Sequence, residues 1–395
     1  MRNPTLKINA AFLQKEKLLW WAYTLAAVAV STQSLWQRVN RHGYTAYENY
    51  VIFKNAFPHL LQGLNPYMAY PAEQWDLYKY SPAFAMAMAP FAALPDWLGL
   101  QLWNLLNALP LLWALLRLPV LLPERRPWLA WFVLPELVIS MQNSQSNGIT
   151  AALILGVFIA MERGKPIRAA GWAAAGGFLK IFGIFAAAPA LVYIRRRRFA
   201  LALIAWSALL LVAPLVLLTA DQLRQVYGWW YALLQTDHSR SVGLSVQGWL
   251  LSWFAWDVPK GWITAGGLLL LGASTFAVYR QPAPAHRILL WASLLLWVVI
   301  FNHKAESPTF VIAMCGVGMW YWQSAENRPW KTILFWTAFA CASLTPTDIF
   351  PRTVRAQLVQ PFVLKAVPCI IIWIAISVQL LHTLLTKQQL TSDEQ

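Results

Sequence analysis

The residues best suited to chemistry lie in residues 44–82, a polar stretch of a very apolar chain. This stretch is rich in tyrosine, tryptophan and phenylalanine, and it carries the carboxylates of Glu48, Glu73 and Asp76. A carboxylate near a membrane surface can act as the general base that deprotonates a hydroxyl nucleophile. We therefore predict that Glu48 or Asp76 is the catalytic base for a lipid substrate with a polar head group, Glu73 being more isolated.

Two lysines in apolar surroundings are suited to bind a phosphate. Lys180 lies midway along the apolar segment 168–194, and Lys304 lies in the sequence NHKAES, residues 302–307, between two apolar runs. A charge at membrane depth costs about 2.5–3.5 kcal/mol on insertion scales unless it lines a cavity or meets an opposite charge. An ammonium group can neutralise a phosphate as a point charge. We predict that Lys180 and Lys304 bind the phosphate of the substrate.

Amide, hydroxyl and charged side chains in the same polar stretches are suited to bind a sugar. The expected substrate contacts come from Asn49, Tyr78, Lys79, Tyr80, Asn143, Gln145, Asn147, His303 and Glu306. The histidines lack the spacing of a metal site such as the zinc-binding H-E-x-x-H motif. The sequence therefore predicts no metal and no cofactor, with a divalent cation left open as an alternative.

The composition excludes a soluble protein. Of the 395 residues, 58% are hydrophobic and 12% are charged, against about 25% charged in a typical soluble domain. The mean hydropathy is +0.47, and apolar runs recur from end to end, so the surrounding solvent must be lipid. The three cysteines lie in apolar segments and indicate neither a disulfide framework nor a metal site. We expect an all-α polytopic membrane protein of about 10–12 transmembrane helices.

The net charge of +15 results from short basic clusters between the apolar runs. These clusters are Arg125/Arg126, Arg163/Lys165/Arg168, Arg195–Arg198, Arg280/Arg287 and Arg328/Lys331. Positive charge concentrated in the loops of one side is typical of the cytoplasmic face of a membrane protein. The clusters therefore predict membrane topology and exclude a nucleic-acid partner.

This charge pattern predicts a single domain, residues 1–395, with both termini in the cytoplasm. The first span is 18–36, and the outer loop 37–97 carries interfacial or re-entrant helices. The remaining spans lie within 98–385, and 386–395 form a cytoplasmic tail. All the polar stretches that carry candidate site residues then meet on the outer face of the membrane.

Two segments need a special topology. Residues 81–95 form a short run broken by three prolines, which predicts a helix embedded in the outer leaflet or re-entrant. The glycine-rich segment 168–194 has basic clusters at both ends. Two short helices that enter and return satisfy both clusters and place Lys180 at the turn between them. Residues 219–260 are expected to stay outside or to dip into the membrane.

Several motifs follow one another in an order that resembles a known family. The first loop ends in G-x-N-P-Y (63–67) and Y-x-Y-S-P (78–82). A short embedded helix, a polar Q/N run and a glycine-rich hairpin with a lone lysine come next. Over residues 18–200 this pattern resembles the GT-C glycosyltransferases of family 87, which are similar to polyprenyl-phosphate-mannose-dependent mannosyltransferases.

The resemblance implies a GT-C-like helical bundle in the plasma (inner) membrane. It also implies a polyprenyl-phosphate-linked sugar donor, for example one carrying mannose, and a lipid or glycan acceptor at an extracytoplasmic site. One position departs from the family pattern. The family carries an aspartate followed by an aromatic residue where this chain has Asn49 and Tyr50, and an amide is no base. The catalytic role then passes to Glu48 or Asp76, or activity is lost.

Two alternatives belong to other functional classes. A transporter or lipid flippase would show paired discontinuous helices in two related halves and charges at the membrane midplane. This chain has one glycine-broken hairpin without a matching partner, and its carboxylates gather in a loop. A non-catalytic envelope-assembly protein of the same fold is the second alternative, and Asn49 favours it.

Overall fold

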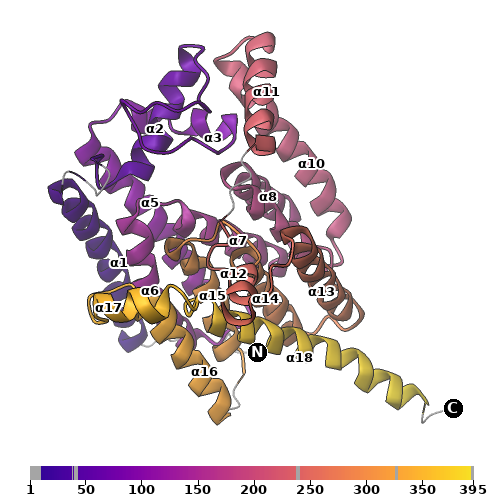
Figure 1. Ribbon diagram of the computed structural model, residues 1–395. Coiled ribbons are helices and arrows are strands. Elements are labelled where there is room, and N and C mark those ends of the chain that lie inside the picture. The colour runs from indigo at the N-terminus through magenta and orange to yellow at the C-terminus, as the bar shows by residue number, and fades with distance from the viewer. Residues whose placement is uncertain (1–9, 38, 40–42, 237–240, 325–327, 393–395) are drawn as a thin grey trace.

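The computed structural model describes residues 10–37, 39, 43–236, 241–324 and 328–392, and this part of the chain is helical without a strand. The helices are α1 Ala10–Gln37, α2 Glu48–Leu61, α3 Pro82–Ala87, α4 Ala89–Ala92, α5 Asp96–Leu116, α6 Arg126–Gln142, α7 Asn147–Glu162, α8 Pro166–Leu179, α9 Ala187–Ala190, α10 Arg196–Val212, α11 Ala220–Thr236, α12 Val246–Phe254, α13 Lys260–Arg280, α14 Pro284–Ile300, α15 Phe310–Trp322, α16 Pro329–Phe339, α17 Arg352–Val354 and α18 Val367–Ser392 (Figure 1).

Four helical segments in this part of the chain are long and apolar enough to cross a membrane. They are Asp96–Leu116, Arg196–Val216, Lys260–Arg280 and Val367–Leu384. Shorter apolar helices such as α7 and α14 pack between them. Together with the hydropathy of the chain, these segments confirm an integral membrane protein.

The centre of the bundle is built from α14 and α15, which are buried along almost their whole length. A Cβ atom at Gly316 of α15 would lie 2.7 Å from the carbonyl oxygen of Ala292 of α14, so the two backbones are in close contact. Small residues allow this approach in membranes, where helix association depends on packing and not on expelling water. Around this pair, α1 is tied to α6 by a hydrogen bond of 2.8 Å from Tyr23 to the carbonyl of Ala130.

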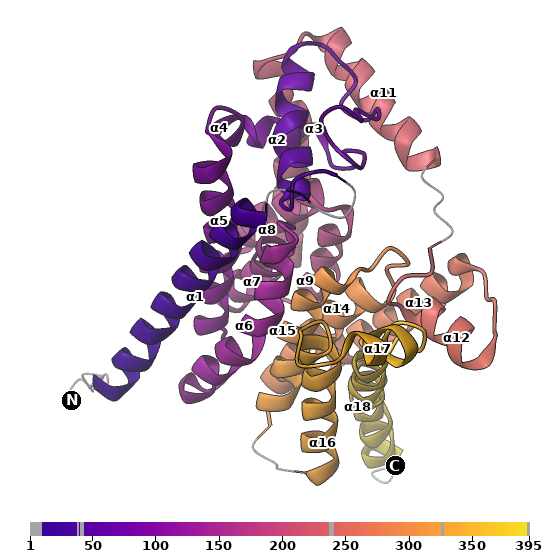
Figure 2. The ribbon, with the colours of Figure 1, turned by 60° about the vertical axis from the view of Figure 1, so that its left-hand side comes forward.

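The polar first loop lies at one end of the bundle, and both termini point toward the other (Figure 2). We call these the loop end and the basic end. The loop end carries α2, α3, α4, α11 and the 301–309 connection. The basic end carries the connections 163–165, 194–196 and 280–284, which hold several of the arginine clusters.

The segments α3 and α4 match the expected short, non-spanning helices. Residues 82–92 would rise about 16 Å as a helix, roughly half of the ~30 Å hydrocarbon core. Ser81 begins α3, because its Oγ accepts the Phe84 N–H at 3.2 Å and Pro82 occupies the first helical position. Phe84 then packs edge-on against Phe53 of α2, which fixes the first loop on the bundle.

The glycine-rich segment forms the expected hairpin. Helix α8 ends at Leu179, and a 3-10 helix, η2 (Ile181–Ala186), and α9 lead the chain back. Two hydrogen bonds show that the chain has returned to the basic end by residue 193. Tyr193 donates to Glu162 at 2.6 Å, and the Arg195 guanidinium donates to the Gly164 carbonyl. The turn leaves no space for a side chain at position 183, because a Cβ there would collide with the backbone of Gly176.

Candidate functional site

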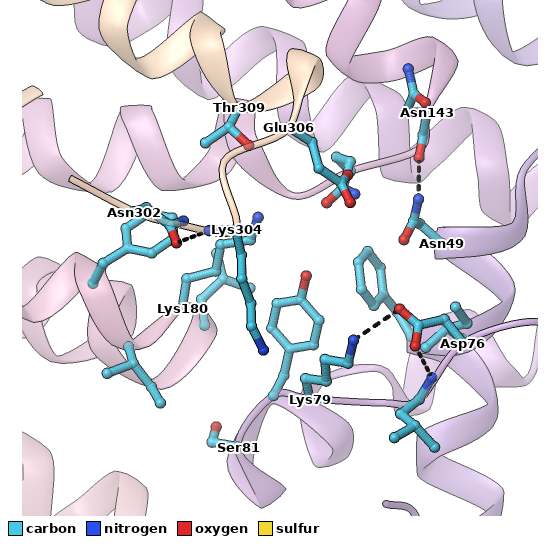
Figure 3. A pocket seen from close by; sticks show the side chains of 18 of the residues that line it. Asn49, Asp76, Lys79, Ser81, Asn143, Lys180, Asn302, Lys304, Glu306 and Thr309 are labelled. Atoms are coloured by element: carbon cyan, nitrogen blue, oxygen red, sulfur yellow. Dashed lines mark hydrogen bonds and ion pairs between the residues drawn. The ribbon is translucent and has the colours of Figure 1, made fainter. Parts of the chain in front are cut away.

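A cavity of about 590 Å³ opens at the loop end, and it is lined by four polar stretches that are distant in the sequence (Figure 3). The stretches are the first loop with the start of α2, the turn between α6 and α7, the break between α8 and η2, and the 302–309 connection. Helix α11 adds Trp230 and Leu234. Glu48, Asp76, Lys180 and Lys304 therefore all face one space.

The two first-loop carboxylates are held by partners of their own. Glu48 is the first residue of α2, and its Oε1 accepts the backbone N–H of Trp75 at 2.8 Å. Asp76 accepts the backbone N–H of Leu77 at 2.7 Å and pairs with Lys79 at 3.0 Å. Both carboxylates line the cavity and also hold the conformation of the loop that carries them.

Glu306 is the third carboxylate of the cavity, and it differs from the other two. Among the residues that the structure describes, its side chain has no hydrogen-bond or ion-pair partner, and it is exposed to the cavity. Its carboxylate lies on the side of the cavity where Asn49 and Asn143 lie (Figure 3). The Asn49 amide donates to the carbonyl of Asn143 at 2.9 Å, which ties α2 to the turn between α6 and α7.

Lys180 follows the last residue of α8, where the partial negative charge of a helix C-terminus favours a cation. Its ammonium donates to the side-chain oxygen of Asn147 at 2.6 Å. The amide nitrogen of Asn147 donates in turn to the carbonyl of Pro308 at 2.9 Å. A single buried amide therefore links the lysine to the connection that carries Glu306.

The 302–309 connection is fixed by contacts with three other parts of the chain. The Ala305 carbonyl accepts the Leu244 N–H at 2.9 Å, and Asn147 holds Pro308. From behind, Lys365 donates to the Ser307 hydroxyl and to Glu136, each at 2.7 Å. The ion pair is buried, with 3% of the Lys365 side chain and none of Glu136 exposed.

The sequence did not predict a role for Lys365 or the pairing of Glu136 with it. Both residues stand alone in apolar segments, and two isolated opposite charges at membrane depth require partners. That shared isolation could have predicted the pair. The structure joins Glu136 to Lys365 and leaves Lys180 to Asn147, so the two isolated lysines have different surroundings.

Most of the expected substrate contacts line the cavity, and three do not. Lys79, Tyr80, Asn143 and Gln145 join Asn49, Lys304 and Glu306 in the lining. Tyr78 is fully buried and donates to the Ser81 carbonyl at 2.8 Å. Asn147 is buried behind Lys180. His303 lies in the turn closed by the hydrogen bond from the Ala305 N–H to the Asn302 carbonyl, and it faces a separate small pocket with Ser245 and Gln247.

Tyr80 lies in the wall of the cavity, and its surroundings there change the pKa of its phenol. Burial raises the pKa of the Tyr80 phenol, and the carboxylates of Glu306 and Asp76 raise it further. The phenol is therefore neutral at physiological pH and serves as a hydrogen-bonding group. Within the described part of the chain, no group of three or more His, Cys, Asp or Glu side chains could hold a metal ion.

Comparison with known proteins decides the family. The model of glycosyltransferase family 87 matches residues 78–308, more than half of the chain. The chain belongs to glycosyltransferase family 87. This family match includes Lys180, Lys304 and Glu306 and begins after Glu48 and Asp76. The protein is a membrane glycosyltransferase, as the sequence predicted.

A solved structure and the curated proteins complete the comparison. The chain is similar to ArnT from Cupriavidus metallidurans bound to undecaprenyl phosphate. The two are 15% identical with a TM-score of 0.37, over 91% of this chain and 76% of that chain. No curated protein matches.

Proposed function

We propose that the protein transfers a sugar from a polyprenyl-phosphate-linked donor to an acceptor hydroxyl in the loop-end cavity. The observation that carries the proposal is one membrane-protein cavity that combines three carboxylates, three lysines and an apolar wall. Membership of family 87 supplies the reaction class. The resemblance of the first-loop motifs supports mannose as the sugar and a lipid or glycan as the acceptor.

The donor has a charged phosphate and an apolar isoprenoid chain, and the two parts bind to different walls of the cavity. Its phosphate binds at Lys180 and Lys304, whose side chains extend into the cavity from different elements (Figure 3). Ile181, Phe182 and Leu234 offer apolar contacts for the isoprenoid chain. Ile181 is 49% exposed, so the chain can continue past it into the surrounding lipid.

The reaction is a displacement at the anomeric carbon. A cavity carboxylate takes the proton of the acceptor hydroxyl, and the lysines stabilise the negative charge that develops on the departing phosphate. In the first loop, Glu48 and Asp76 are the candidates for the base. Asn143, Gln145 and the neutral Tyr80 phenol supply hydrogen bonds for sugar hydroxyls.

The cavity opens on the extracytoplasmic side of the inner membrane in this proposal, because the arginine clusters lie in the connections of the basic end. A membrane-impermeant thiol reagent should label a single cysteine at position 76 from outside and one at position 197 only from inside. Arg197 is exposed, so a lack of access would not explain poor labelling there. External labelling at 197 would reverse the orientation and contradict an extracytoplasmic site.

The main experiment measures sugar transfer and donor binding with a panel of polyprenyl-phosphate sugars, including mannose. Wild-type protein should transfer one of them. Lys180→Met and Lys304→Met should fold and lose donor binding by at least about tenfold, since each removes a charged contact to the phosphate. The matched control is Arg224→Met, at a loop-end residue whose side chain is 86% exposed and outside the cavity. Its donor binding should equal that of the wild type.

The same assay separates the other functional classes. A flippase would move the lipid between leaflets without forming a glycosylated product. An assembly protein would bind lipid and show neither activity. Absence of transfer with every donor, together with unchanged binding in both lysine variants, would contradict the proposal.

A further inference from the structure

We propose that Glu306, and not a first-loop carboxylate, is the catalytic general base. The inference rests on the proposed glycosyl transfer and names the group that activates the acceptor. A base must have a lone pair free to receive the proton at the moment of attack. The three cavity carboxylates can therefore be compared by what already occupies their oxygens.

Two of the three already bond to their own loop. Asp76 pairs with Lys79 at 3.0 Å and accepts the Leu77 N–H at 2.7 Å, so a proton taken up by this carboxylate would weaken contacts that shape the loop. Glu48 accepts the N–H of Trp75 at 2.8 Å, so protonating it would weaken a bond that shapes the loop. Glu306 has no such bond among the described residues, and its carboxylate can accept a proton without disturbing the fold.

The backbone beneath Glu306 is held rigidly although its side chain has no partner. Ala305, Ser307 and Pro308 each have a hydrogen bond to another part of the chain. The bond to Ser307 comes from Lys365, which is itself paired with the buried Glu136. These bonds hold the backbone of Glu306 at a fixed place in the cavity wall, while its carboxylate stays open to the cavity.

The placement of Glu306 also fits the direction of the reaction. Lys304 and Glu306 leave the same connection in different directions, Lys304 across the cavity and Glu306 toward the Asn49 side (Figure 3). A sugar held between them has its phosphate beside the lysines and an acceptor beside Glu306. Asn49 cannot compete for the proton, because an amide is not a base at this pH and its NH₂ group is bonded to Asn143.

The step balances without a further reactant. The acceptor hydroxyl gives its proton to a Glu306 oxygen as its own oxygen forms a bond to the anomeric carbon. The bond from that carbon to the phosphate oxygen breaks, and its electron pair leaves with the polyprenyl phosphate. Lys180 and Lys304 stabilise the added negative charge. The protonated Glu306 then releases its proton to water in the open cavity.

The test compares Glu306→Gln with Glu48→Gln and Asp76→Asn, using the polyprenyl-phosphate sugar that the wild type transfers. Removing a general base typically lowers the rate about 10²–10⁴-fold. We expect that loss in kcat for Glu306→Gln, with the Kd for donor nearly unchanged, which also shows that the variant folds. The two first-loop variants should lose less than about tenfold, because their carboxylates act only on the loop.

A pH profile separates a base from a positioning residue. Turnover of the wild type should fall toward acid pH as the base becomes protonated. Glu306→Gln should lose this acid limb, while Glu306→Asp, Glu48→Gln and Asp76→Asn should keep it. Turnover of Glu306→Gln within tenfold of the wild type, or an acid limb that persists in it, overturns the inference and leaves the proposed function intact. A wild type that neither binds nor transfers any donor overturns the proposed function and the inference with it.

Discussion

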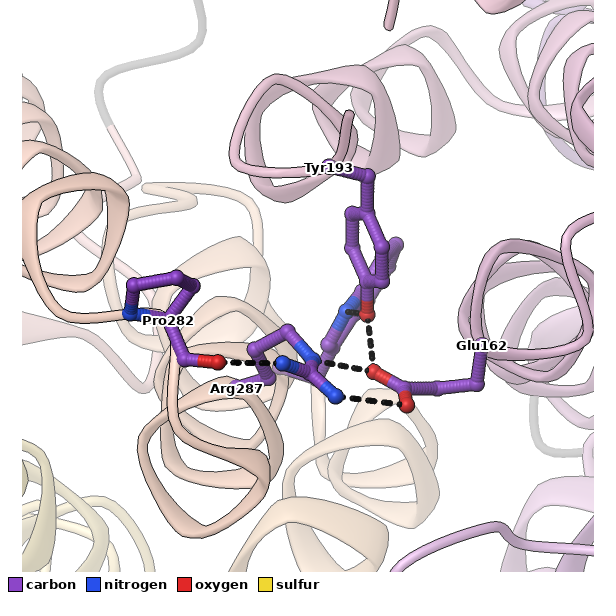
Figure 4. A network of polar contacts seen from close by, with 5 residues as sticks. Glu162, Tyr193, Pro282 and Arg287 are labelled. Atoms are coloured by element: carbon purple, nitrogen blue, oxygen red, sulfur yellow. Dashed lines mark hydrogen bonds and ion pairs between the residues drawn. The ribbon is translucent and has the colours of Figure 1, made fainter. Parts of the chain in front are cut away.

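Glu306 at the loop end and Glu162 at the basic end are both glutamates next to a helix terminus, and their surroundings are opposite. Glu162 ends α7, and its two oxygens accept from the Arg287 guanidinium at 2.6 and 3.0 Å (Figure 4). Tyr193 donates to the same carboxylate at 2.6 Å. Glu306 has none of these contacts within the described residues. A carboxylate that is fully bonded holds helices together, and one that is anchored but unbonded is available for chemistry.

The Glu162 cluster joins three elements that are distant in sequence. Arg287 lies in the first turn of α14, and it also donates to the Pro282 carbonyl. Tyr193 follows α9 and accepts a hydrogen bond of 3.2 Å from Trp291. The cluster lines a second cavity of about 380 Å³. Because its charges already satisfy one another, that cavity offers no free carboxylate comparable to Glu306.

The largest loss of stability is expected from Lys365→Met, which removes the hydrogen bond to Ser307, the residue after Glu306. The substitution leaves the Glu136 carboxylate buried without its cation, and breaking a buried pair in this way costs about 3–5 kcal/mol. Thermal unfolding of the detergent-solubilised protein should show a large fall in melting temperature. Asp348→Asn is the matched control, since Asp348 is 97% exposed in its pair with Arg355 and should contribute little.

A double variant, Glu136→Leu with Lys365→Met, should recover most of the lost stability, because no buried charge is then left alone. It should not recover full turnover, since Ser307 still lacks its partner and Glu306 is less precisely held. Full recovery of both properties would show that the pair contributes stability alone.

An intermediate effect is expected from Arg287→Met at the basic end. It removes two charge-assisted hydrogen bonds from a carboxylate whose side chain is 11% exposed, which costs about 1–3 kcal/mol. Turnover per folded molecule should stay at the wild-type level, since the cluster lies far from the loop-end cavity. A large drop in kcat at unchanged stability would mean that the two ends are coupled, and it would contradict a purely structural role for the Glu162 cluster.

The smallest effect should come from Lys79→Met. Its pair with Asp76 is partly exposed, at 34% and 50% for the two side chains, and such pairs contribute about 0–1 kcal/mol. The melting temperature should hardly change. Turnover should also stay near the wild-type level if Glu306 is the base, whereas a base at Asp76 would lose the partner that positions it and kcat would fall.

The sequence predicted most of the elements that build the cavity. Apolar runs and their flanking arginines placed α7 at residues 147–162, the same bounds that the structure gives. The basic clusters at both ends of the glycine-rich segment 168–194 predicted the hairpin, and the hairpin placed Lys180 at its turn. The same rules predicted that Glu48, Asp76, Lys180 and Lys304 lie on one face, and in the structure all four line one cavity.

The partners of individual side chains were beyond the reach of sequence. Nothing in the order of residues shows that Asp76 bonds to Lys79 while Glu306 stays unbonded, since this depends on how the loop turns. The burial of Tyr78 and the placement of His303 in another pocket depend on the same local geometry. Position in a motif therefore favoured the first-loop carboxylates, and contacts favour Glu306.

The planar side-chain amide of Asn147 is a rigid link between Lys180 and Pro308. Among the described residues, its oxygen accepts from Lys180 and its nitrogen donates to the Pro308 carbonyl, so turning the amide around would bring two donors together and two acceptors together. The spacing between Lys180 and the connection that carries Glu306 is therefore set by two hydrogen bonds of one side chain. A misplacement of about 1 Å can cost a hundredfold in rate, and this small rigid part limits how far the lysine and that connection can drift apart.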